Sequence, residues 1–282
     1  MCIRDSIGSE LMPIRRAKTS ILKSGDIALI GMPFDDHSSF LKGPAKAPLL
    51  IIDAIENDSA NYFTEDLIDL ADHPDVCWLG NAPLKDYFDI EVIIAEILKL
   101  GAIPFSIGGD HSITYPILRA MSASYPSLSI LHFDAHGDLY DSWLGNRYSH
   151  ASPFARIMEE GLSQRLTQVG IRTLNDHQQM QVSKFGVRVV DMRNWSPVTD
   201  LNLSGPVYLS FDMDVLDPAF APGVSHHEPG GFTTREVLRM IQLLDLNIVG
   251  LDLVEYNPDR DLNGVTAMTA AKIIKELLAK LL

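Results

Sequence analysis

Six side chains of the kinds that bind metal ions follow three short apolar runs in this sequence. They are His111, Asp134, His136, Asp138, Asp212 and Asp214. Carboxylates and imidazoles suit Mn²⁺, Fe²⁺, Ni²⁺ or Zn²⁺, and no thiolate is among them. Four carboxylates with two imidazoles are too many for one tetrahedral zinc ion, but they suit two divalent cations that share bridging oxygens. The residue types therefore predict a dinuclear metal site.

The spacing within the clusters supports this prediction. Residues two apart point the same way while a strand continues, so Asp134 would face the same side as His136, and Asp212 the same side as Asp214. A turn at Gly137 would then bring round the third ligand of its cluster. An isolated Asp at a strand end more often caps a helix or forms an Asx turn. Three clusters that each end an apolar run favour metal binding over that alternative.

Apolar runs that recur along the whole chain must position these clusters. Eight of them are nearly continuously apolar, which is typical of parallel strands covered on both faces, and they lie at 27–31, 76–80, 103–107, 128–133, 166–171, 187–191, 207–211 and 248–254. Helix-type segments alternate with them at 47–55, 90–100, 113–123, 152–160, 235–244 and 265–281. This alternation predicts an α/β fold, a three-layer doubly wound sheet of about eight mostly parallel strands, with ligands beyond their carboxyl ends. A closed eight-stranded barrel remains an alternative.

The composition narrows the classes of protein that fit. With 282 residues, of which 46% are hydrophobic and 21% charged, the chain is expected to form a single domain over 1–282. Its net charge of −14 argues against nucleic acid and anionic membrane surfaces as partners, and it favours the approach of a cationic substrate. No apolar run approaches the roughly eighteen residues that a membrane span needs.

The cysteines and the start of the chain bear on its compartment. Two cysteines, Cys2 and Cys77, give no disulfide framework, and the first residues lack the apolar region of a signal peptide. We therefore expect a reducing, cytoplasmic compartment. Residues 1–6 resemble a translated adapter sequence, and we expect them to be a non-native leader outside the fold.

Four stretches resemble motifs of the ureohydrolases, the arginase and agmatinase family, and the resemblance covers nearly all of the chain from about residue 27. They are Gly108-Gly109-Asp110-His111-Ser112, Asp134-Ala135-His136-Gly137-Asp138, Ser210-Phe211-Asp212-Met213-Asp214-Val215-Leu216-Asp217-Pro218 and Asp252-Leu253-Val254-Glu255-Tyr256-Asn257-Pro258. None of the six metal ligands of the family is missing. Other stretches resemble plant-type arginases, namely His37-Ser38-Ser39-Phe40-Leu41, Tyr148-Ser149-His150-Ala151-Ser152, Ala221-Pro222-Gly223-Val224-Ser225-His226 and Thr266-Ala267-Met268.

The resemblance implies a hydrolase that uses two Mn²⁺ ions, with Ni, Co, Fe or Zn as alternatives, to cleave a guanidinium substrate into urea and an amine. It places His111 and Asp138 on one ion and His136 and Asp214 on the other, with Asp134 and Asp212 as bridges. Glu255 falls at the position of the carboxylate that pairs with the guanidinium, which can donate two parallel N–H bonds to it. His150 falls at the position of a proton-passing histidine, and Asp138 would carry a proton to the leaving amine.

The tail of the substrate depends on other residues. Arginine, agmatine and guanidinobutyrate share the small cationic guanidino end, and the resemblance to plant-type arginases favours L-arginine, with L-ornithine as the product. Asn146, Asn175 and His226 are expected to contact the tail, with Arg147 as a further partner for a carboxylate. The family also implies a homo-oligomer, a trimer or a hexamer. His132 lies within a strand run and is expected to be a core histidine with satisfied hydrogen bonds.

Three alternatives differ in the chemistry they require. An agmatinase or guanidinobutyrase would release urea with putrescine or 4-aminobutyrate. A zinc amide hydrolase of the deacetylase type needs one metal and a Tyr or His pair, which six ligands do not fit. A metal-binding relative without turnover would be expected to lack a ligand or the guanidinium carboxylate, and neither loss is visible in this sequence.

Overall fold

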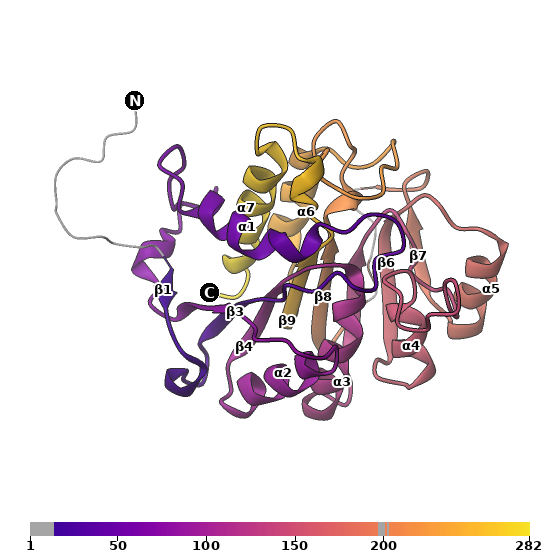
Figure 1. Ribbon diagram of the computed structural model, residues 1–282, viewed down its shortest axis with the longest axis horizontal. Helices are drawn as coiled ribbons and strands as arrows, with labels where there is room; N and C mark the ends of the chain where they lie inside the picture. Colours follow the sequence, from indigo (N-terminus) through magenta and orange to yellow (C-terminus); the bar gives the residue numbers. More distant parts are fainter. Residues whose placement is uncertain (1–13, 197–200, 202) are drawn as a thin grey trace.

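Nine parallel strands form one open sheet in this protein, whose computed structural model describes residues 14–196, 201 and 203–282 (Figure 1). The expected leader at residues 1–6 lies outside the described residues. The strands follow the spatial order β1-β3-β2-β4-β9-β8-β5-β6-β7. Their bounds are β1 (Arg15–Arg16), β2 (Ile27–Gly31), β3 (Val76–Asn81), β4 (Ile103–Ile107), β5 (Ser129–Phe133), β6 (Arg165–Ile171), β7 (Arg188–Asp191), β8 (Pro206–Asp212) and β9 (Asn247–Val254).

The sheet confirms the expected α/β fold and removes the barrel alternative, because β1 and β7 are separate edges that do not pair with each other. All eight predicted strands are present, with bounds that differ from the prediction by at most one residue at either end. The additional strand, β1, has only two residues and pairs with β3. A run that short has no apolar pattern of its own, so the sequence did not indicate it.

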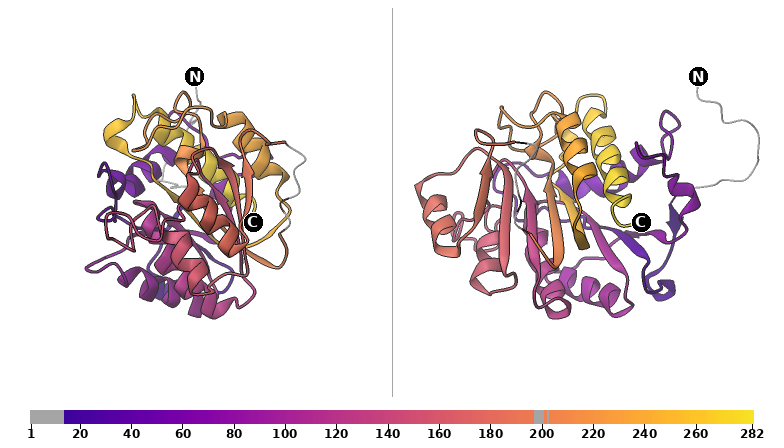
Figure 2. Two further views of the ribbon diagram at one scale, coloured as in Figure 1. Left: turned by 90° about the vertical axis from the view of Figure 1, so that its right-hand side faces the viewer. Right: turned by 180° about the vertical axis from the view of Figure 1, so that it is seen from behind.

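Helices cover both faces of the sheet, as the views of Figure 2 show, and the described residues form seven α-helices. They are α1 (Ala47–Ile55), α2 (Asp89–Lys99), α3 (Thr114–Ser124), α4 (Pro153–Glu159), α5 (Asp176–Phe185), α6 (Thr234–Leu243) and α7 (Val265–Leu278). Short 3-10 helices are η1 (Thr19–Ile21), η2 (Pro44–Lys46), η3 (Leu70–Asp72), η4 (His111–Ile113), η5 (Met213–Val215) and η6 (Pro258–Arg260). Helix α7 packs against α1 and α6 on one side, and α3 packs against α2 and α4 on the other. Six of the seven helices were predicted, and α5 was not.

Two hydrophobic cores lie on opposite faces of the sheet, because successive residues of each strand alternate between them. In β5, Ile130 belongs to the core beneath α2, α3 and α4, whereas Leu131 belongs to the core beneath α1, α6 and α7. Both side chains are fully buried. This double coverage explains why the strands are apolar throughout rather than alternating. Among the helices of the described residues, none is both long and apolar enough to cross a membrane.

The order of the strands determines where side chains can meet. The four central strands are β4, β9, β8 and β5, and they are neighbours in space although the chain visits them far apart in sequence. All run parallel, so their carboxyl ends open onto the same edge of the sheet. Open α/β sheets bind ligands at this edge, where the order of the strands reverses. The metal-ligand-type residues follow these four strands.

Candidate metal centre

Each of the four central strands places a candidate site residue at its carboxyl end. His111 begins η4 just after β4, Asp134 directly follows β5, and Asp212 is the last residue of β8. Glu255, the expected guanidinium carboxylate, directly follows β9. All four side chains are buried. Sequence clusters that are up to 144 residues apart therefore converge at one edge of the sheet, as the pattern predicted.

His111 lies at the centre of three carboxylates. Its Nδ1 atom is 3.2 Å from Asp134 Oδ2, 3.1 Å from Asp138 Oδ2 and 3.0 Å from Asp212 Oδ2. This nitrogen is buried and makes no hydrogen bond of good geometry, whereas Nε2 of the same ring is 2.9 Å from Ser210 Oγ. A buried imidazole nitrogen without a hydrogen-bond partner, faced by three carboxylate oxygens, fits the donor set of a divalent cation.

A second group of donors lies beside the first. His136 Nδ1 is 2.9 Å from Asp214 Oδ2 and 3.3 Å from Asp134 Oδ1. Asp134 thus directs one oxygen to His111 and the other to His136. A carboxylate that contacts both imidazoles has the arrangement that a bridge between two cations requires.

The electrostatics of this cluster also fit bound cations. Burial raises the pKa of Asp212 well above its usual range, and the charges of Asp214 and Asp134 raise it further. Burial and the Asp134 charge raise the pKa of Asp214 to about 6, although His136 opposes them. Carboxylates crowded in a buried place repel one another unless positive charge is present. Bound divalent cations would be the largest local charges and would offset this repulsion.

Two site residues occupy a backbone conformation that side chains seldom adopt. Asp138 has φ of 47° and Glu255 has φ of 64°. A non-glycine residue in the left-handed region costs free energy, and such residues concentrate at functional sites. The neighbouring Gly109 has a different reason for its small size, because a Cβ atom there would lie 1.7 Å from the carbonyl oxygen of Phe34.

Glu255 and His150 form a buried pair next to the candidate ligands. His150 Nδ1 is 2.8 Å from Glu255 Oε1, which also accepts a hydrogen bond of 2.9 Å from the backbone N–H of His111. Burial lowers the pKa of His150, but the Glu255 carboxylate outweighs burial and raises that pKa to about 9. The backbone N–H of Ser39 donates to His150 Nε2 over 3.1 Å. The Ser39 hydroxyl lies 2.7 Å from the same nitrogen and can donate to a neutral ring or accept from a protonated one.

A cavity of about 260 Å³ connects these groups. The residues that line it are Ser39, His136, Asp138, Tyr140, Trp143, His150, Ala151, Thr173, Gln178, Asp212, Asp214, His226, Glu228 and Glu255. His226 was expected there, and its ring centroid lies 5.3 Å from that of His150. Tyr140, Trp143, Gln178 and Glu228 were not identified from the sequence. Tyr140, Trp143 and Glu228 lie in loops that follow the ligand clusters, a signal that could have indicated them, whereas Gln178 lies in α5.

The other residues expected at the substrate tail do not line this cavity. Asn146 accepts a hydrogen bond from the backbone N–H of Tyr148 over 2.9 Å. Asn175 caps α5 and donates from Nδ2 to the Tyr140 hydroxyl over 2.7 Å. The Arg147 guanidinium donates to Glu159 over 2.9 Å. Asn175 therefore contacts Tyr140, which lines the cavity, but does not line it itself. Asn146 and Arg147 stabilise the adjacent loop.

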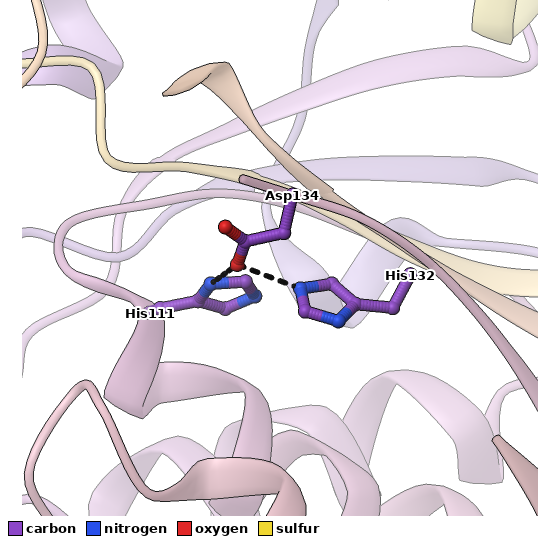
Figure 3. A group of neighbouring side chains, drawn as sticks. All are labelled: His111, His132 and Asp134. Carbon is purple, nitrogen blue, oxygen red and sulfur yellow. Dashed lines mark hydrogen bonds and ion pairs between the residues drawn. The ribbon is translucent and has the colours of Figure 1, made fainter. Parts of the chain in front are cut away.

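His132 lies beside His111, with both rings against Asp134, and is fully buried (Figure 3). Its Nε2 atom is 2.8 Å from Asp134 Oδ2, and its Nδ1 atom is 3.0 Å from Gln168 Nε2. Burial lowers the pKa of His132, although the Asp134 carboxylate opposes this. Both ring nitrogens have partners, as expected of a core histidine.

An open parallel sheet with His and Asp side chains gathered at the ends of its central strands defines an α/β protein built around a metal centre. Residues 25–279 match the model of the Arginase family, and the chain belongs to that family. The mitochondrial arginase of Medicago truncatula is 46% identical over 275 residues, which cover 90% of this chain and 81% of that protein. Arginase 2, chloroplastic/mitochondrial, of Arabidopsis thaliana is 44% identical, with 90% of this chain and 80% of that protein covered.

Solved structures of two proteins show the same fold. The arginase from Medicago truncatula superposes with a TM-score of 0.85 at 43% sequence identity, covering 91% of this chain and 87% of that one. Proclavaminate amidino hydrolase from Streptomyces clavuligerus gives a TM-score of 0.86 at 29% identity, covering 99% of this chain and 98% of that one. The resemblance to plant-type arginases within a hydrolase family that acts on linear amidines is thereby confirmed.

The comparisons correct the expected compartment. We predicted a cytoplasmic protein, but the similar plant arginases are named as mitochondrial or as chloroplastic and mitochondrial. The prediction was wrong because it rested on the cysteine count, which indicates a reducing environment. A low cysteine count does not separate the cytosol from the interior of an organelle.

Proposed function

We propose that this protein is an arginase, which hydrolyses L-arginine to L-ornithine and urea. The observation that carries the proposal is the convergence of six metal-ligand-type side chains at one edge of the sheet, where four of them line one cavity together with the buried Glu255. The names of the plant relatives, at 44% to 46% identity, support arginine as the substrate. Hydrolysis adds water across the bond between the guanidinium carbon and the alkyl nitrogen, and releases urea and an amine.

The proposed centre holds two Mn²⁺ ions, with Ni, Co, Fe or Zn as alternatives. In this assignment His111 and Asp138 would hold the first ion, His136 and Asp214 would hold the second, and Asp134 and Asp212 would serve both. The contacts of Asp134 with the imidazoles of both His111 and His136 support its assignment to both ions. When bound, a pair of divalent cations lowers the pKa of a water towards neutrality, so that a nucleophile is available at physiological pH.

Glu255 is the proposed partner of the guanidinium. Its Oε1 atom already accepts from His150 and from the His111 backbone, whereas Oε2 makes no hydrogen bond with the described part of the chain. A carboxylate oxygen that lines the cavity with open acceptor capacity can take an N–H of a guanidinium and orient its carbon. His150, beside Glu255, is proposed to exchange protons with the leaving amine, and Asp138 to carry a proton to it.

One observation favours a second candidate, an agmatinase. The residues that line the cavity include Glu228 and, within the described chain, no Lys or Arg. A carboxylate near the tail would attract the doubly cationic agmatine and offer nothing to the carboxylate of arginine or guanidinobutyrate. His226, which also lines the cavity, is the proposed tail contact that could serve either substrate.

We also propose that the chain forms a single domain and assembles into a homo-oligomer, a trimer or a hexamer. The single sheet that runs through the described residues supports the first statement, and family membership supports the second.

Urea release from arginine, agmatine, guanidinobutyrate and guanidine, measured after activation with Mn²⁺, tests the proposal. We expect arginine to give the highest kcat/KM. If agmatine or guanidinobutyrate is used ten times more efficiently than arginine, the arginase assignment is wrong while the ureohydrolase chemistry stands. If none of the four releases urea, the proposed reaction is wrong.

A further inference from the structure

A row of buried polar side chains crosses the sheet beneath the candidate ligands. Gln168 in β6 is in register with His132 in β5, His132 with Ser210 in β8, and Ser210 with Asp252 in β9. All four side chains are fully buried. Most interior positions of these strands are apolar, so a polar row must be satisfied by its own members. The part formed by His132 and Gln168 is not explained by substrate or metal contacts.

The hydrogen bonds of Gln168 establish which way its amide points. Its Nε2 atom is 2.6 Å from the carbonyl oxygen of Gly137 and 3.0 Å from His132 Nδ1. A carbonyl oxygen only accepts, so the NH₂ end of the amide must face Gly137. The second hydrogen of the same NH₂ group then points to His132. Turning the amide over would place its oxygen against the Gly137 oxygen.

This orientation determines the tautomer of His132. Because Nδ1 accepts from Gln168, the single proton of the neutral ring is on Nε2. That N–H donates to Asp134 Oδ2 over 2.8 Å (Figure 3). Phe154 holds the ring in place, with the two ring centroids 4.0 Å apart and an interplanar angle of 31°. Gln168 therefore directs a hydrogen-bond donor at the carboxylate that contacts both His111 and His136.

An unsatisfied atom indicates that the two N–H bonds of Gln168 set the orientation of its amide. Its Oε1 atom is buried and has no hydrogen-bond partner within the described chain. A buried acceptor without a partner is costly, and proteins rarely keep one. The chain keeps this one with the NH₂ group facing both Gly137 and His132. Gly137 precedes Asp138, whose φ of 47° turns its side chain to the same centre.

His132 could instead be a metal ligand, because its nitrogen lies in a compact group with those of His111 and Asp134. A ligand must present a lone pair to the cation. Nδ1 of His132 uses its lone pair for Gln168, and Nε2 carries the proton that Asp134 accepts. Neither nitrogen is open, so His132 acts on the centre through Asp134.

We propose that His132 and Gln168 are positioning residues for the metal centre: Gln168 holds His132 in the tautomer that fixes Asp134, and it anchors the turn that presents Asp138. The inference rests on the proposed metal-binding function of Asp134 and Asp138. Groups that orient metal ligands in this way typically change metal affinity by about 10-fold to 100-fold when they are lost. The pair thus sets affinity, while the number of ions stays the same.

Calorimetric titration of metal-stripped protein with MnCl₂ tests this without any turnover. The variants are Gln168→Met, which keeps the volume and loses both N–H donors, and His132→Phe, which keeps an aromatic ring against Phe154. We expect both to bind two ions, with Kd raised about 10-fold to 100-fold. Urea release by these variants should return to near the wild-type kcat at saturating Mn²⁺, with KM for the substrate unchanged. A merely structural defect would not be rescued by metal in this way.

Thr167→Val is the matched control. Thr167 neighbours Gln168 in β6, is equally buried and faces the other side of the sheet, where its hydroxyl donates to the carbonyl oxygen of Leu201. It should lose a hydrogen bond without any change in Mn²⁺ affinity. If His132→Phe does not fold, as judged by circular dichroism, Gln168→Met decides the question alone because it leaves the ring stack intact.

The outcomes separate this inference from the proposed function. Wild-type Mn²⁺ affinity in Gln168→Met overturns the positioning role while the dinuclear centre stands. A His132→Phe variant that binds one ion fewer shows that His132 is a ligand, which also overturns it. Wild-type protein that binds no Mn²⁺ overturns the metal assignment itself, and the inference with it.

Discussion

His150 Nδ1 lies 2.8 Å from Glu255 Oε1, and both side chains are buried at the edge of the cavity. The contact fixes one oxygen of the carboxylate, and the backbone N–H of His111 fixes the same oxygen from a second direction. The other oxygen, Oε2, makes no hydrogen bond with the described part of the chain and can still accept one. Glu255 is therefore held in position before any substrate arrives, and its orientation costs little when a guanidinium binds.

Replacing Glu255 with Gln should lower kcat/KM for arginine by about a hundredfold or more. The variant keeps the size and some hydrogen bonding, but it removes the charge that pairs with the guanidinium. Loss of one member of a buried hydrogen-bonded charge pair costs about 2–5 kcal/mol, and each 1.4 kcal/mol is about tenfold. Steady-state urea release measures the effect. Mn²⁺ content should stay the same, and full efficiency in the variant would place the guanidinium partner elsewhere.

Removing the metal should lower the thermal stability of the protein. Burial raises the pKa values of Asp212 and Asp214, and the charge of Asp134 raises both further, an effect that bound cations would offset. A ligand that binds only the folded state adds about 2.7 kcal/mol at a hundredfold excess over its Kd. Melting curves recorded after chelation and again after addition of Mn²⁺ should differ by several degrees. Identical curves would contradict a structural contribution of the metal.

His136→Asn should weaken the binding of one of two Mn²⁺ ions and reduce turnover by orders of magnitude. The reason is that His136 and Asp214 contact each other at 2.9 Å and are assigned to the same ion. Asp214→Ala should have the same effect. Metal analysis with urea release measures both, and Asp141→Asn is the control. Asp141 belongs to the same loop but pairs with Arg156, so that variant should keep two ions. Wild-type turnover by either ligand variant would refute the assignment.

Much of the centre could be predicted because its signal is local in the sequence. Each cluster of His and Asp directly follows an apolar run, and parallel strands open their carboxyl ends onto one edge. Asp134 and Asp212 are therefore positioned by strands that the sequence shows plainly. What the sequence does not show is the spatial order of the strands, because β8 and β9 insert between β4 and β5 although they come last in the chain.

Helix α5 shows why the substrate-tail residues could not be predicted in the same way. Its residues are mostly polar, so no apolar stripe indicated a helix over Asp176–Phe185. The helix is defined instead by its ends: Asn175 accepts from the backbone N–H of Gln178, and Gly186 has the left-handed φ of 63° that closes it. The role of Asn175 as a cap could not be predicted, because it depends on a helix that the pattern did not reveal.

His132 and Gln168 illustrate a different limit. They are 36 residues apart, and each alone is a polar residue within an apolar run. Their pairing depends on the register between β5 and β6, since a shift of one residue would turn one of them to the opposite face of the sheet. Register is not encoded in either run separately. A core histidine could be predicted from the sequence, but its donor bond to Asp134 could not.

Glu228 should influence selectivity for the substrate tail, whereas Arg147 should not. Glu228 lines the cavity, whereas the Arg147 guanidinium is engaged by Glu159 and does not line it. Glu228→Gln should lower kcat/KM for agmatine, whose tail is a lone ammonium, and should raise it for guanidinobutyrate, whose tail is anionic. Partly exposed charge pairs contribute about 0.2–1 kcal/mol, so changes of up to about fivefold are expected. Arginine carries both charges in its tail and should change least.

Arg147→Ala is the matched comparison, because it removes the nearby cation that the sequence suggested for the carboxylate of arginine. We expect KM for arginine to stay within about twofold of the wild-type value, since a rim-exposed charge that does not touch the substrate contributes little. Parallel kinetics with arginine, agmatine and guanidinobutyrate measure both variants. If Arg147→Ala raises KM for arginine tenfold and leaves agmatine unchanged, Arg147 does reach the carboxylate. The loop that holds it against Glu159 must then rearrange when the substrate binds.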